Sequence, residues 1–237
     1  MKAAAEIESK EWRIAVGSDE TIARFEPALA TPTGSVFVFA HGAGGHMDDR
    51  GMLPLAQQFR MRGMHVVRFN FLYRAKGTSA PDAMPKLKDC IAAVVARVRE
   101  ELQPATLIIG GRSMGGRAAS MRAAEKFACD GVLLLAYPLH PAGKPEKLRD
   151  AHLAQIEVPV LCINGTRDAL CTHTLMQSMV SRLRDTWTMH RLQGADHSFR
   201  VTKASGRSDS DVLNEISGAT NIWAAALRKR SAQPDGS

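Results

Sequence analysis

The sequence of 237 residues has no long hydrophobic segment and few cysteines. No apolar run reaches the eighteen residues that a membrane-spanning helix needs. Charged residues interrupt the apolar stretches of the N-terminal segment MKAAAEIESKEWR, so it lacks the hydrophobic region of a secretory signal. No C-x-x-C pair occurs among Cys90, Cys129, Cys162 and Cys171, which argues against a disulfide scaffold or a zinc site. We therefore expect a cytoplasmic protein with reduced thiols, no membrane partner and no metal.

The charge pattern and the glycine pattern exclude two further kinds of ligand. The net charge is +7, but the basic residues are scattered among acidic and apolar ones, which predicts a solvated surface and no nucleic-acid partner. The one basic cluster, residues 228–230, precedes the polar tail SAQPDGS and resembles an ordinary frayed terminus. The glycine-rich segment HGAGG lacks both G-x-G-x-x-G and the P-loop ending. We expect no cofactor.

Short apolar runs rich in β-branched residues alternate with longer amphipathic stretches, a pattern typical of a mostly parallel sheet flanked by helices. The alternation predicts strands at residues 36–40, 64–70, 106–111, 131–137, 158–166 and 187–192. It predicts helices at residues 50–62, 83–102, 115–128, 174–183 and 211–230. The segments WRIAV and TIARFEP near the N-terminus resemble antiparallel edge strands. The result is an α/β fold with helices on both faces of its sheet.

The predicted elements run almost from end to end, so we expect a single α/β domain over residues 1–237. Its core spans residues 12–229, and residues 230–237 form a disordered tail. Ser208 and Asp211 fit a capping box for the last helix. The segment between Pro138 and Pro159 has room for a short helix but not for a large lid domain, which predicts an open site.

The segment GRSMG at residues 111–115 fits G-x-S-x-G and stands directly between a predicted strand and a predicted helix. This motif places a serine on a strained turn, where small neighbours tolerate the crowded backbone and leave the hydroxyl exposed. Ser113 is therefore the candidate nucleophile. The alternative is an ordinary turn between a strand and a helix, because glycine and serine populate such turns as well.

A serine nucleophile needs a general base and an acidic residue that orients the base. His197 follows the last predicted strand in the loop QGADHSF and is the candidate base, the alternative being a surface histidine. Asp168 follows another strand in NGTRD and gives the chain order Ser, Asp, His that is typical of one class of serine hydrolase. Asp196 adjoins His197, but its position favours a role as a turn former.

An oxyanion formed during acyl transfer needs backbone N–H donors, and two segments can supply them. HGAGG at residues 41–45 directly follows a strand, so its Ala43 N–H can pair with that of Met114, the residue after the nucleophile. We expect the substrate pocket to include His41, Gly42, Arg74, Arg112 and Tyr137. Arg74 and Arg112 favour an anionic substrate, although Arg112 could equally brace neighbouring loops.

Four segments together, HGAGG, GGRSMGGR, NGTRDALC and GADHSF, resemble the dienelactone-hydrolase-like branch of the α/β hydrolases. The elbow GRSMGGR and the segment PLHPAGKPEKLR are similar to those of the small KANL3/Tex30-like family. The resemblance covers about residues 36–199 and implies a lidless α/β-hydrolase fold with Ser113, Asp168 and His197 as its triad. It implies no particular substrate.

The sequence thus predicts a serine hydrolase that cleaves a small-molecule ester or thioester through an acyl-enzyme intermediate. The alternative is a catalytically weak or inactive scaffold of the same fold, because some members of the resembling family act within large complexes. An intact set of candidate catalytic residues favours the enzyme. The leaving group, the acyl preference and the oligomeric state are left open.

Overall fold

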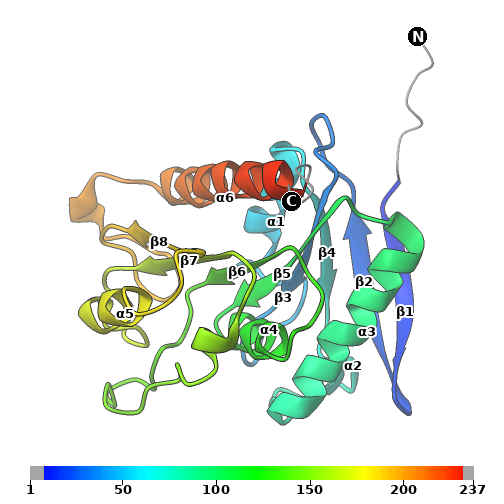
Figure 1. Cartoon of the computed structure of the whole chain (residues 1–237), viewed down its shortest axis with the longest axis horizontal. Helices are drawn as coiled ribbons and strands as arrows, with labels where there is room; N and C mark the ends of the chain where they lie inside the picture. The colour runs from blue at the N-terminus through cyan, green and yellow to red at the C-terminus, as the bar shows by residue number, and fades with distance from the viewer. Residues whose placement is uncertain (1–7, 232–237) are drawn as a thin grey trace, which may run out of the picture.

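The computed structural model describes residues 8–231, which form an eight-stranded sheet between two layers of helices (Figure 1). Across the sheet the strands lie in the order β1-β2-β4-β3-β5-β6-β7-β8. Their bounds are β1 Lys10–Val16, β2 Asp19–Glu26, β3 Ser35–Ala40, β4 His65–Phe69, β5 Thr106–Arg112, β6 Gly131–Leu135, β7 Val160–Gly165 and β8 Trp187–Leu192.

The sheet is mostly parallel, as the sequence predicts. Strands β3 to β8 all pair in parallel, while β1 and β2 form an antiparallel pair at one side. The prediction of two edge strands is wrong for β2. This strand pairs antiparallel with β4, with Ala23 opposite Phe69, so it lies inside the sheet and β1 alone forms that edge. Strand β4 therefore has a neighbour on each side, β2 in antiparallel and β3 in parallel pairing.

Helices cover both faces of the sheet. Their bounds are α1 Leu53–Met61, α2 Leu72–Ala75, α3 Met84–Leu102, α4 Met114–Ala124, α5 His173–Val180 and α6 Asp209–Ser231, with short 3₁₀ turns at Leu153–Gln155 and Lys203–Ser205. Side chains of α2, α3, α4 and α5 belong to one apolar core, and side chains of α1 and α6 belong to a second core on the opposite face. Figure 1 shows this division, with α6 on the far side of the sheet from α3 and α4.

The long helix α3 shows why the sequence pattern predicts its position well. Its apolar residues recur at spacings of three and four, so they share one face of the helix. The structure buries that whole face, which consists of Leu87, Cys90, Ile91, Val94, Val95 and Val98. The helix ends at Leu102, because Gln103 after it has a left-handed backbone (φ 42°) and Pro104 prevents a further turn.

The closing helix α6 begins at the predicted capping box. The Ser208 N–H donates to the Asp211 carboxylate at 2.8 Å, and the Asp211 N–H donates to the Ser208 hydroxyl at 3.2 Å. The predicted tail begins too early, because α6 continues through Arg230 and Ser231. The rest of the predicted tail, residues 232–237, lies outside the described residues.

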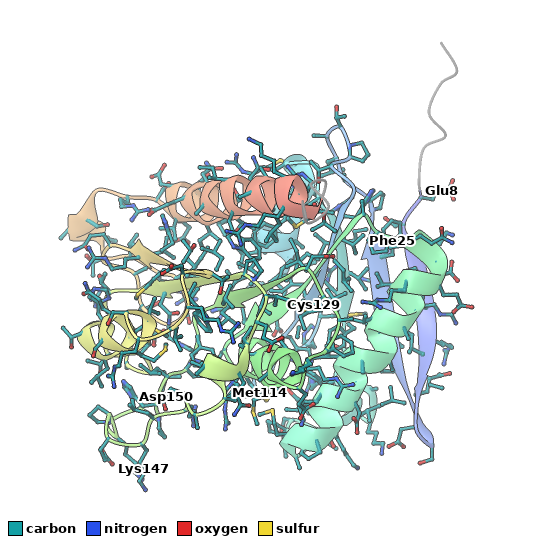
Figure 2. The ribbon with its side chains drawn as sticks, in the orientation of Figure 1. Glu8, Phe25, Met114, Cys129, Lys147 and Asp150 are labelled. Carbon is teal, nitrogen blue, oxygen red and sulfur yellow. The ribbon has the colours of Figure 1, made fainter. Side chains whose placement is uncertain are left out.

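The connection between β6 and β7, residues 136–159, contains one 3₁₀ turn and no inserted helical domain, in agreement with the absence of a large lid. Lys147, labelled in Figure 2, lies on this connection at the margin of the molecule. Among residues 8–231, no helix combines the length and the apolar character needed to cross a bilayer.

The buried face of α3 predicts a specific loss of stability. Ile91 is 1% exposed, so Ile91→Ala leaves a cavity between α3 and the sheet and should lower the free energy of unfolding by about 2–5 kcal/mol. Lys86→Ala on the exposed side of α3 should change it by less than about 0.5 kcal/mol. Urea unfolding followed by circular dichroism checks both values, and equal losses would contradict this packing of α3.

Candidate active site

The candidate nucleophile lies on a strained turn at the carboxyl end of the sheet. Ser113 joins β5 to α4 with a backbone at φ 48° and ψ −114°, a region that residues other than glycine rarely occupy. Its N–H donates to the carbonyl of Leu135 at 2.9 Å, which ties the turn to β6. Met114, labelled in Figure 2, is the first residue of α4.

Glycines allow this turn to press against the end of β3. A Cβ on Gly111 would lie 2.4 Å from the carbonyl oxygen of Ala40, and one on Gly115 would lie 2.5 Å from that of His41. Real Cβ atoms do not approach a carbonyl so closely, so both positions require glycine. The turn is therefore built around backbone-to-backbone contact.

The structure brings the three predicted triad residues into one hydrogen-bonded chain. His197 Nε2 lies 3.0 Å from the Ser113 hydroxyl. His197 Nδ1 lies 2.8 Å and 3.0 Å from the two carboxylate oxygens of Asp168. A carboxylate accepts hydrogen bonds only, so Nδ1 carries the proton and Nε2 is left to accept the proton of the serine.

Asp168 is held in place by partners besides the histidine. Its side chain is fully buried and accepts the Leu170 N–H at 2.8 Å, while the Asn164 amide lies at 3.4 Å. Asn164 also exchanges hydrogen bonds with the backbone of Tyr137, so it links the ends of β6 and β7 beneath the acid. Sequence reasoning missed Asn164, although a polar residue at the end of the buried strand VLCING was a usable signal.

Asp196 takes the turn-forming role that the sequence favours for it. One of its carboxylate oxygens accepts the N–H groups of Ser198 at 2.8 Å and Arg200 at 2.9 Å. These bonds fix the loop that carries His197 after β8, while the ring of His197 pairs with Asp168 instead. The two neighbouring carboxylates thus have different partners.

The loop HGAGG is held by hydrogen bonds to one of its carbonyl groups. The carbonyl of Gly42 accepts hydrogen bonds from His41 Nδ1 at 2.8 Å, the Gly45 N–H at 3.2 Å and the Tyr73 hydroxyl at 3.4 Å. In a trans peptide the C=O and N–H point in opposite directions, so fixing this carbonyl directs the Ala43 N–H to the other side. Ala43 lines the same cavity as Ser113.

His41 itself is a buried support of this loop. Its Nε2 accepts the Phe71 N–H at 3.1 Å, so the proton resides on Nδ1, which donates to Gly42. Burial lowers the pKa of His41 to about 4, which keeps the ring neutral in this bonding pattern. The residue therefore lies behind the loop and does not line the cavity.

The nucleophile opens into a cavity of about 500 Å³, which we call the nucleophile cavity. Two of the five predicted pocket residues, Gly42 and Arg112, line it. Sequence reasoning missed several others that lie just after the glycine-rich loop or after Asp168. The full lining consists of Gly42, Ala43, Gly45, Asp49, Arg50, Gly51, Met52, Arg112, Ser113, Leu170 and His197.

Three predicted pocket residues lie elsewhere for clear physical reasons. Tyr137 is fully buried and donates its hydroxyl to the Arg149 carbonyl at 2.6 Å, which makes it a core residue. Arg74 lies in α2 and donates to the carbonyl of Thr78, just after that helix, at 3.0 Å. His41 is the buried support described above.

Arg112 both braces a neighbouring loop and lines the substrate cavity, the two roles that the sequence leaves open. Its Nη2 donates to the backbone carbonyl of His197 at 3.1 Å, and its guanidinium lies 5.4 Å from the ring centre of Phe199. These contacts brace the loop that carries the base. The side chain also lines the nucleophile cavity, where burial lowers its pKa and the charge of Asp49 opposes that effect.

Comparisons with known proteins agree with this architecture. The family model of the α/β hydrolase domain matches residues 33–225. An α/β serine hydrolase homologue from Coxiella burnetii has a TM-score of 0.73 at 18% identity and covers 89% of this chain and 96% of its own. An α/β serine hydrolase without lid from Xanthomonas campestris has a TM-score of 0.72 at 23% identity, and the match covers 91% of this chain and 95% of that protein. Dienelactone hydrolase from Anabaena variabilis has a TM-score of 0.70 at 17% identity, covering 91% and 96%. At these identities the structural likeness establishes a shared fold.

The neutral state of His41 predicts a pH dependence of stability. Its pKa is about 4 when folded and near 6.5 when unfolded, so the unfolded chain takes up the proton first as the pH falls. This effect is absent above pH 7 and should lower the free energy of unfolding by about 2 kcal/mol at pH 5. Urea unfolding of the wild type and of His41→Asn at both pH values measures it. Parallel pH profiles for the two proteins would rule out a neutral buried His41.

Proposed function

This chain belongs to the α/β-hydrolase family, and we propose that it is a serine hydrolase that cleaves a small-molecule ester or thioester. The observation that carries the proposal is the continuous chain of hydrogen bonds from Asp168 through His197 to Ser113, which ends at an open cavity. A purely structural serine has no need of a base that is itself oriented by a buried acid.

In the proposed reaction Ser113 attacks the carbonyl carbon of the bound ester while His197 Nε2 takes the hydroxyl proton. Asp168 keeps the ring in the required tautomer and stabilises the imidazolium that forms. The tetrahedral intermediate collapses as the protonated histidine gives its proton to the leaving alcohol or thiol, which leaves an acyl-enzyme. Water activated by His197 then releases the acid and restores the serine.

The negative oxygen of the tetrahedral intermediate needs preorganised donors. The Met114 N–H is one, since the first residues of a helix have N–H groups without partners inside the helix. The Ala43 N–H is the other, supported by the anchoring of the Gly42 carbonyl on its opposite side. Donors of this kind are typically worth roughly 10²–10³ in rate each.

Three finer features belong to the same proposal. We assign the whole chain to one catalytic domain that resembles the KANL3/Tex30-like branch of the family. We also place the protein in the cytoplasm, which is supported by the four unpaired cysteines. Burial raises the pKa of Cys90, Cys129 and Cys171 to about 12, so these thiols are unreactive and Ser113 is the proposed nucleophile.

The first prediction of this proposal concerns the nucleophile. A fluorophosphonate probe should label the wild type at Ser113, and p-nitrophenyl acetate should be hydrolysed at a rate that Ser113→Ala lowers by roughly 10⁶. Intact-mass spectrometry and absorbance at the nitrophenolate band measure the two effects. A folded wild type that neither labels nor turns over would replace the enzyme with the scaffold alternative.

The second prediction separates the two neighbouring carboxylates. Asp168→Asn should lower kcat by roughly 10⁴, because an amide cannot hold the histidine in the required tautomer. Asp196→Asn is the matched control, since its amide oxygen can still accept the N–H groups of Ser198 and Arg200. It should retain most of the activity. If the two variants lose activity equally, Asp168 is not the orienting acid.

A further inference from the structure

A second cavity of about 510 Å³ adjoins the nucleophile cavity, and three residues, Arg50, Gly51 and Arg112, line both. One wall of the second cavity is apolar and is formed by Pro54, Leu55 and Leu213. Arg200 joins Arg50 and Arg112 in its lining. The second cavity therefore continues the space in front of Ser113 into a region with three guanidinium groups.

The three arginines come from separate parts of the fold and are not engaged in ion pairs. Arg50 precedes α1, Arg112 ends β5, and Arg200 lies in the loop after His197. Within residues 8–231, none of the three has a carboxylate within ion-pair distance, although fourteen other ion pairs involve an arginine or lysine elsewhere in the same range. The side chains of Arg50 and Arg200 make no hydrogen bond in the described part of the chain. The cavity thus has three guanidinium groups that form no ion pair with the carboxylates of the described residues, and one carboxylate, Asp209, in its lining.

Arg112 is the innermost of the three and is only partly satisfied. One nitrogen donates to the His197 carbonyl, and its Nε is buried without a partner. Its Nη1 occupies the space beside Gly51, where a Cβ would lie 2.0 Å away. A partly desolvated guanidinium attracts an anion more strongly than a fully hydrated one, because the local dielectric is lower.

We propose that Arg50, Arg112 and Arg200 form a subsite for a carboxylate carried by the substrate itself. The inference rests on the proposed function, since it places the ester carbonyl at Ser113 and the carboxylate in the adjoining cavity. The substrate class is then an ester or thioester that bears a free carboxylate. A planar carboxylate matches the paired N–H donors of a guanidinium.

The other groups at the second cavity favour a single negative charge over a double one. Asp209 is also part of its lining and disfavours a more highly charged group, such as a phosphate monoester. The apolar wall suits the short hydrocarbon chain between the ester and the carboxylate. Arg74 and Lys76, by contrast, are engaged with Thr78 and Asp19 outside both cavities, so they do not contribute.

The test compares two esters of equal chain length, p-nitrophenyl hydrogen adipate and p-nitrophenyl hexanoate, which differ in the terminal carboxylate. The double variant Arg50→Gln with Arg200→Gln should lower the ratio of kcat/KM for adipate over hexanoate by about tenfold or more, mainly through KM. The double variant Arg182→Gln with Arg184→Gln is the matched control. It makes the same charge change just before β8, at the opposite end of the strands, and should leave the ratio within about twofold.

The carboxylate can lie on the acid side or on the alcohol side of the ester, and a second pair of substrates distinguishes these cases. The second pair is 4-acetoxybenzoate and methyl 4-acetoxybenzoate, which carry the carboxylate or its methyl ester on the leaving group. If the double variant lowers the kcat/KM ratio of this pair and leaves the ratio of adipate over hexanoate unchanged, the subsite holds the leaving group. A loss in either pair supports the subsite. An unchanged ratio in both pairs, together with turnover that depends on Ser113, overturns the subsite and leaves the proposed function intact.

A binding measurement tests the subsite without catalysis. In isothermal titration, the Ser113→Ala variant should bind monomethyl adipate and should not bind methyl hexanoate. Adding Arg50→Gln and Arg200→Gln should weaken the affinity for monomethyl adipate about tenfold. Equal affinity with and without Arg50 and Arg200 overturns the subsite even if the wild type has no esterase activity. Binding that depends on these arginines in an inactive wild type supports the subsite and refutes the proposed function.

Discussion

The close approach of the turn around Ser113 to the end of β3 is the contact on which the rest of the site depends. Gly111 and Gly115 let two backbones meet where any side chain would collide with the carbonyls of Ala40 and His41. This contact holds Ser113 at a positive φ and brings the loop after β3 over the nucleophile. The local strain is tolerated because β5 lies at the centre of the sheet, paired with β3 and β6.

The rest of the site is built mainly by hydrogen bonds that fix backbone groups, and less by bonds that fix side chains. His41 and Tyr73 donate to the Gly42 carbonyl and so fix one peptide group, while the Asp196 carboxylate closes the loop that carries His197. Asp168 is the exception, a fully buried side chain that receives its position from Leu170 and Asn164. Such an arrangement needs no movement of large elements to form, which fits a site without a lid domain.

The sequence predicted the eight strands, all helices but the short α2, and the hydrogen-bonded chain, because these depend on local signals. The spacing of apolar residues in α3 identifies its buried face, and Ser113, Asp168 and His197 each follow a strand in a parallel sheet, whose carboxyl ends meet at one edge. It could not show that Tyr137 turns its hydroxyl inward to Arg149, because the direction of a side chain after a strand depends on its neighbours in space. For the same reason, it missed that Arg50 and Arg200 line one cavity.

Arg112 shows that bracing a loop and binding an anion are compatible roles for one side chain. A guanidinium has five N–H donors, and the carbonyl of His197 occupies one of its nitrogens. In the proposed subsite this contact would couple the two cavities, because an anion bound to Arg112 would also act on the loop that carries the base. Substrate charge would then influence the position of His197 as well as affinity. Because of this contact, substitutions of the outer arginines, Arg50 and Arg200, should separate binding from catalysis more cleanly than a substitution of Arg112.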